Sequence, residues 1–162
     1  MTLSAILTTN TIYKAFYDEY NKLNAFLHSH SYTANPIACT AANASLDLFE
    51  KNDTLKKNVK LSEYIKKRME KLSEHPNVAE VRQHGMITAV EMIKNKSKRI
   101  SYDWRERRGL RAYLFGLKHN VLIRPLGNVI YLMPPYVIKK NEINQAINVI
   151  EGAINEATKQ KS

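Results

Sequence analysis

Apolar residues recur at helical spacing in several stretches of the chain. A helix is predicted to begin near Lys140, with a buried face that consists of Ile143, Ile147, Ile150 and Ile154. Another is predicted to begin at Asn52 or Asp53 and to end at His75 and Pro76. Its apolar stripe consists of Leu55, Val59, Ile65, Met69 and Leu72. A third helix, over residues 104–119, is expected to bury Leu110, Leu114 and Leu117.

Short apolar runs between turn residues predict four strands in the second half of the chain. Residues 78–82 and 86–93 flank the pair His84 and Gly85. Residues 121–123 and 129–133 flank a turn that contains proline and glycine. The order of elements from residue 78 onward is therefore β-β-α-β-β-α, which predicts a small α+β domain with an antiparallel sheet.

The first 50 residues have a different pattern. Residues 3–9 are β-prone, Asn10 can cap a helix, and Ile12, Phe16 and Tyr20 predict a short amphipathic helix. The pair Asn35–Pro36 predicts another helix start, followed by small residues that favour burial. A single strand here has no sheet to join. We therefore expect residues 1–50 to be the tail of a larger α/β domain, residues 51–75 a connecting helix and residues 76–162 a small C-terminal α+β domain.

The formal net charge of +10 raises the question of a nucleic-acid partner. Six lysines lie between the apolar positions of one predicted helix, where a solvated face is expected: Lys56, Lys57, Lys60, Lys66, Lys67 and Lys71. No zinc-finger spacing, RGG tract or aromatic RNA-binding motif accompanies them. We therefore favour a solvated face and expect no nucleic-acid partner.

Other features limit the compartment and the chemistry. No run of about 18 uncharged apolar residues is present, so no membrane span is expected. The single cysteine, Cys39, cannot form an internal disulfide, which fits a cytoplasmic protein, and its apolar surroundings favour a small buried hydrophobe. His28 and His30 have no third ligand at a suitable spacing, so no metal site is predicted.

Two segments could bind anions. Residues 28–36, HSHSYTANP, place hydroxyls and imidazoles just before a predicted helix N-terminus, where phosphate groups bind well. The alternative is a polar surface loop in which Asn35 only caps the helix. Arg124 follows an apolar strand and precedes proline, which would fix a guanidinium for bidentate carboxylate binding. It could equally be an exposed turn arginine, and Tyr131 could line the same site or only pack.

Four motifs together resemble the class III aminotransferases, enzymes of fold type I that use pyridoxal phosphate (PLP). The motifs are LSAILTTNTIY (residues 3–13), FLHSHSYTANPIACTAANASL (26–46), VRQHGMITAVEM (81–92) and LIRPLGNVIYLMPPYVI (122–138). The last motif favours the branch of biotin biosynthesis, whose members transfer the amino group of S-adenosylmethionine to 8-amino-7-oxononanoate. The resemblance covers essentially the whole chain.

The resemblance implies roles for single residues. His30 and Ser31 would bind the PLP phosphate of a neighbouring subunit, because the family builds its active site across a homodimer interface. Ser29 would lie beside the substrate. Arg124 would bind the carboxylate of the keto-acid substrate, with Tyr131 nearby.

The sequence departs from the family pattern in instructive places. Ala34 replaces the glycine before Asn-Pro, Ser29 stands where glycine is common, and Ser31 keeps the hydroxyl that threonine usually supplies. The family's Schiff-base lysine is expected just before Leu3, so the N-terminal half would be missing from these 162 residues. We therefore expect a C-terminal part that is inactive alone. The alternatives are a fragment of another class III aminotransferase and a non-catalytic assembly or binding domain.

Overall fold

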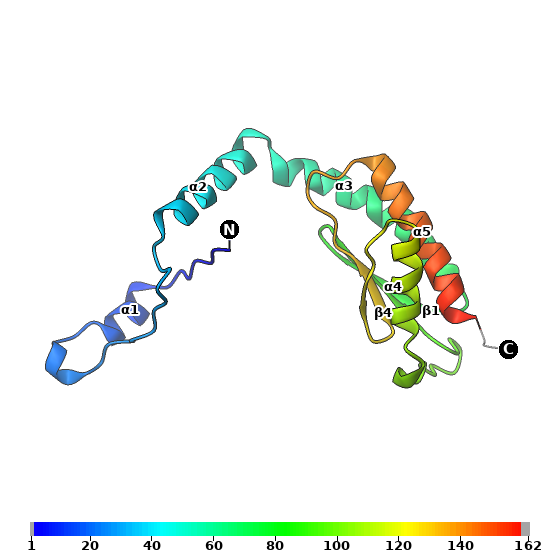
Figure 1. Cartoon of the computed structure of the whole chain (residues 1–162), viewed down its shortest axis with the longest axis horizontal. Coiled ribbons are helices and arrows are strands. Elements are labelled where there is room, and N and C mark those ends of the chain that lie inside the picture. The colour runs from blue at the N-terminus through cyan, green and yellow to red at the C-terminus, as the bar shows by residue number, and fades with distance from the viewer. Residues whose placement is uncertain (1, 160–162) are drawn as a thin grey trace. The chain divides into compact units, whose positions relative to one another are not determined.

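The computed structural model describes residues 2–159, which form two compact units, one up to Asp53 and the other from Thr54 onward (Figure 1). The first unit contains helices α1 (Asn10–Phe16) and α2 (Pro36–Lys51), with a short 3-10 turn, η1 (Tyr20–Lys22), between them. The second unit contains all the strands and the helices α3, α4 and α5. No helix among residues 2–159 is long and apolar enough to cross a membrane.

The first unit is largely helix and irregular loop. Residues 3–9, predicted as a strand, form none, because no neighbouring strand is available to pair with them within the described part of this unit. The side chain of Thr9, rather than that of Asn10, caps α1. The helix ends at Phe16, so the predicted continuation to Tyr20 is wrong.

Helix α2 begins as its sequence predicts. The Asn35 side chain accepts a hydrogen bond of 3.0 Å from the Ala38 amide, and Pro36 occupies the first turn. The burial expected of its small residues is limited to Ala38, while Cys39 is half-buried.

The second unit contains a four-stranded antiparallel sheet, which confirms the predicted architecture. The strands are β1 (Val78–His84), β2 (Ile87–Met92), β3 (Arg124–Leu126) and β4 (Val129–Leu132), in the spatial order β1-β2-β4-β3. Burial alternates along β2 and β4, as expected for a sheet with one covered face. The pairing places Arg82, Ala89, Tyr131 and Arg124 in one row across the less buried face.

Three helices contribute to the core on the covered face. They are α3 (Thr54–Met69), which continues into the 3-10 turn η2 (Glu70–Glu74), α4 (Arg108–Lys118) and α5 (Lys140–Thr158). All four predicted isoleucines of α5 are buried, which confirms its face. The six lysines between residues 56 and 71 are exposed, as predicted, but so are Leu55 and Val59 in the first turns of α3.

The predicted helix over residues 104–119 is interrupted. A 3-10 turn, η3 (Trp104–Glu106), precedes α4, and Arg107 between them has a left-handed φ of 50°. The buried face of α4 consists of Arg108, Gly109, Ala112 and Gly116, whereas Leu114 and Leu117 are exposed. The prediction of a leucine face was wrong because the helix lies too close to its neighbours for large side chains. A Cβ on Gly109 would lie 2.3 Å from the carbonyl oxygen of Gly127.

The strand predicted at residues 121–123 is shifted along the chain. Residues 121–123 are irregular, and β3 starts at Arg124, inside the predicted turn. The actual connection to β4 is the pair Gly127–Asn128. Pro125 lies within β3 and is compatible with it because β3 is an edge strand of the sheet.

Candidate substrate and cofactor site

Arg124 and Tyr131 face each other across the edge of the sheet. They are paired residues of β3 and β4, and paired residues of antiparallel strands point to the same face. The guanidinium carbon of Arg124 lies 5.9 Å from the centre of the Tyr131 ring. No hydrogen bond or ion pair joins this guanidinium to another described residue, and the side chain is exposed. Its five donors are therefore available to a ligand.

An open groove of about 640 Å³ adjoins these two residues. Its wall includes Leu132, Pro134 and Val137, and the start of α5 contributes Lys139 and Glu142. The Glu142 carboxylate accepts a hydrogen bond of 2.7 Å from the Lys139 amide and so closes a capping box. A cation at the mouth of a partly apolar groove suits a ligand with a carboxylate and an aliphatic chain.

The loop before α2 is a compact turn. The His30 amide donates to the Thr33 hydroxyl over 3.1 Å, and the Thr33 amide donates to the His30 carbonyl over 2.9 Å. The imidazoles of His28 and His30 are 5.2 Å apart. Ser29, His30 and Ser31 are all exposed, and the Ser31 hydroxyl has no hydrogen-bond partner among residues 2–159.

Ala34 in this loop has a positive φ of 58°. Alanine rarely adopts this left-handed conformation, whereas glycine adopts it freely. The residue stands at the position where the class III pattern has glycine, so the structure gives a physical reason for that glycine. The turn persists here at the cost of local strain.

The predicted site residues thus form two groups. Arg124 and Tyr131 lie together in the second unit, and Ser29, His30 and Ser31 lie together in the first unit. Each group is exposed or half-buried and can reach a ligand.

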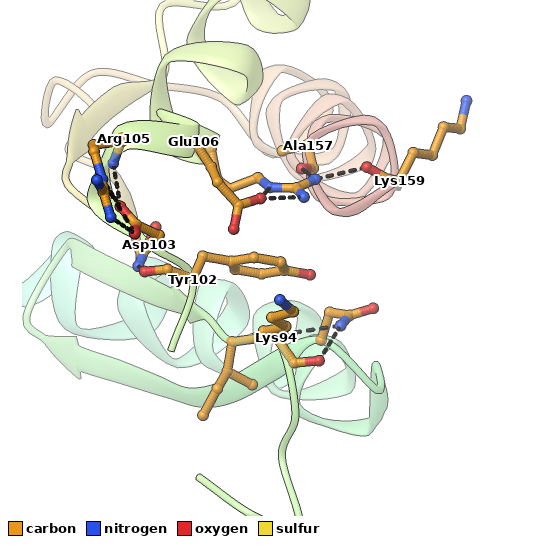
Figure 2. Close-up of polar contacts among 11 residues, drawn as sticks. Lys94, Tyr102, Asp103, Arg105, Glu106, Ala157 and Lys159 are labelled. Carbon is orange, nitrogen blue, oxygen red and sulfur yellow. Dashed lines mark hydrogen bonds and ion pairs between the residues drawn. The ribbon is translucent and has the colours of Figure 1, made fainter. Parts of the chain in front are cut away.

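Sequence reasoning missed a cluster of charges at η3 and the start of α4 (Figure 2). Arg108 is buried, and its guanidinium donates to the Glu106 carboxylate and to the carbonyls of Ala157 and Lys159 at the end of α5. The hydrogen bond from Arg108 lowers the pKa of Glu106. Nearby, hydrogen bonds from Arg105 lower the pKa of the Asp103 carboxyl to about 2. The only sequence signal was a dense run of charges that periodicity assigned to a helix surface.

Comparison with known proteins defines the family. Residues 1–154 match the class III aminotransferases, and the chain belongs to this family. It is 40% identical over 158 residues to the adenosylmethionine-8-amino-7-oxononanoate aminotransferase of Geobacter sulfurreducens, a match that covers 98% of this chain and 35% of the relative. The same enzyme of Helicobacter pylori is 41% identical over 161 residues, covering 97% of this chain and 35% of the relative.

Solved structures agree with this assignment. The crystal structure of adenosylmethionine-8-amino-7-oxononanoate aminotransferase from Methanocaldococcus jannaschii superposes with a TM-score of 0.87 at 33% identity, covering 92% of this chain and 34% of that one. A PLP-bound aminotransferase mutant from Vibrio fluvialis shares the fold, with a TM-score of 0.79 at 20% identity, over 85% of this chain and 30% of that one. The chain spans about a third of the length of the relatives it matches.

Proposed function

We propose that this chain forms the C-terminal portion of a PLP-dependent aminotransferase that transfers the amino group of S-adenosylmethionine to 8-amino-7-oxononanoate. The observation that carries this proposal is the Arg124 guanidinium, which is exposed beside the Tyr131 ring at an open groove. The relatives that carry this enzyme's name match nearly the whole chain, which supports the choice of substrates.

Arg124 would bind the carboxylate of the amino acceptor. A guanidinium offers two parallel N–H donors to the two carboxylate oxygens, which fixes both the position and the direction of the substrate. The Tyr131 ring restricts the guanidinium on one side. The apolar part of the groove wall would accommodate the aliphatic chain of the acceptor and exclude water from it.

The loop before α2 fits the phosphate of PLP. Ser31 has an unused hydroxyl, and His30 precedes it in a turn that leads into the N-terminus of a 16-residue helix. When bound, PLP supplies an electron sink that allows an amino group to move between substrates. By the resemblance, His30 and Ser31 would serve the cofactor of a second subunit in a homodimer, and Ser29 would lie beside the substrate.

The lysine that holds the cofactor in this family is expected in the two thirds of the relatives' length that this chain does not span. The 162 residues by themselves are therefore expected to show no transamination. Activity should require the preceding part of such an enzyme.

The test is a chimaera in which residues 3–162 follow the corresponding N-terminal part of the Geobacter sulfurreducens relative. It should transaminate 8-amino-7-oxononanoate with S-adenosylmethionine as donor. Arg124→Lys keeps the charge but removes the paired donors, so kcat/KM for the acceptor should fall between tenfold and about a hundredfold.

The matched control is Arg99→Lys, because Arg99 is also exposed but does not line the groove. This variant should keep full activity. A chimaera whose acceptor kinetics are the same for Arg124→Lys and Arg99→Lys would refute the role of Arg124.

A further inference from the structure

A second pocket, of about 530 Å³, lies at the other end of α5 from the groove. Its lining comes from the connection after β2, from η3 and α4, and from the end of α5 at Thr158. Because α5 has 19 residues, the two sites are separated by a helix about 28 Å long. The pocket is therefore distinct from the proposed substrate site.

Positive charge predominates in the pocket lining. Lys94, Arg108 and Arg111 line it together with a single carboxylate, that of Glu106. The Glu106 carboxylate is already paired with Arg108, at 2.5 Å. Neither the ammonium of Lys94 nor the guanidinium of Arg111 has an ion-pair or hydrogen-bond partner among residues 2–159. Lys94 interacts with Asp103 and Glu106, and Arg111 with Glu156, only without direct ion pairs, and the pocket lining keeps an excess of positive charge.

Tyr102 adds a neutral hydrogen-bond donor to the pocket lining. Its side chain is only 6% exposed, and its ring lies between Glu106 on one side and Lys94 on the other (Figure 2). The Arg108 guanidinium contacts the ring at 4.5 Å from its centre. Tyr102 lines the pocket, and its hydroxyl has no hydrogen-bond partner in the described part of the chain and is not fully buried.

No group of the described residues engages this hydroxyl, so it is available to a ligand oxygen. Burial raises the pKa of Tyr102, although the charge of Arg108 opposes the shift. The hydroxyl therefore keeps its proton at neutral pH and acts as a donor. A donor beside an excess of positive charge suits an anionic acceptor.

We propose that this pocket binds a phosphate-type oxyanion, held by Lys94, Arg111 and the Tyr102 hydroxyl. Lys94 and Tyr102 lie on the connection after β2 and Arg111 lies on α4, so the donors do not form one flat fork, which suits a tetrahedral anion better than a planar carboxylate. The bound anion bridges the connection after β2 and helix α4.

The experiment is a calorimetric titration of the full chain with inorganic phosphate at low ionic strength. One saturable site is expected, with acetate binding clearly more weakly. Tyr102→Phe removes only the hydroxyl and keeps the ring under Arg108, and it should weaken phosphate binding about fivefold. Lys94→Gln and Arg111→Gln each remove a charged donor and should weaken it tenfold or more.

Matched controls lie outside the pocket. Tyr113→Phe on the same helix and Lys98→Gln on the same connection should bind phosphate as the unchanged chain does. Arg124→Lys should also leave binding unchanged, which separates this site from the proposed substrate site. The proposal is overturned if phosphate shows no saturable binding, if acetate binds as tightly, or if the three pocket variants bind like the controls.

Discussion

The two units of this chain differ sharply in how they treat apolar side chains. Among residues 2–159, every buried hydrophobic residue except Ala38 belongs to the unit that starts at Thr54. In the unit up to Asp53, Ile6, Leu7 and Leu27 are each more than 90% exposed. The second unit thus forms its hydrophobic core from its own residues. The exposed apolar side chains of the first unit suit contacts beyond those that the described residues make. Such contacts are expected, because the relatives of this chain are about three times as long.

The largest effect that separates the two units should come from truncating a core residue. Ile154 is fully buried in the core of the second unit, so Ile154→Ala should lower the free energy of unfolding by about 3 kcal/mol. Leu7→Ala in the first unit removes a side chain that is 95% exposed and should change it by less than about 0.5 kcal/mol. Urea unfolding of the full chain measures both. Equal losses of unfolding free energy in the two variants would contradict this difference between the units.

A smaller difference should separate the ion pairs of the two units. Arg108→Met keeps an apolar stem against Tyr102 but leaves the carbonyls of Ala157 and Lys159 without their donor. It should cost about 2 kcal/mol in the same urea experiment. Lys22→Met breaks the exposed pair with Asp18 and should have no measurable effect. If Lys22→Met proved as costly as Arg108→Met, burial would not be the cause of the difference.

The smallest effect concerns the strained turn of the first unit. Ala34→Gly relieves a left-handed alanine, but glycine loses more chain entropy on ordering, so the net local gain should be about 0.5 kcal/mol. Hydrogen exchange of the Ala38 amide, which bonds to the Asn35 side chain, should slow about twofold. Ala41→Gly, within α2, is the matched control and should speed exchange in that helix. Faster exchange in Ala34→Gly would show that φ at this position is not limiting.

The sequence predicted elements well where one physical signal dominated. The isoleucines of α5 have a single apolar face, and only one orientation of the helix buries them. In α4, two faces have the same periodicity, because Leu110, Leu114 and Leu117 recur like Gly109, Ala112 and Gly116. Hydrophobicity favoured the leucines as the buried face. In the structure the small residues are buried instead, because Gly109 packs closely against Pro125 and Gly127. Such a close approach is a tertiary property that no local pattern contains.

The candidate site was predictable only in part for a similar reason. The pairing of Arg124 with Tyr131 follows from two strands and a tight turn, although the strand before the turn was placed three residues too early. The Arg108 cluster joins residues about 50 positions apart in the sequence. Its partners at the end of α5 are backbone carbonyls, which every residue has. Side-chain identity therefore gave no indication of this contact.

Pro125 has one more consequence for the edge of the sheet. A foreign β-strand could add to β3 only by exchanging main-chain hydrogen bonds with it, and proline has no amide hydrogen to give. With only three residues in this strand, one such position is enough to make docking of a further strand unfavourable. The β3 edge of the sheet is thereby protected from aggregation, and the neighbouring Arg124 stays accessible from solution.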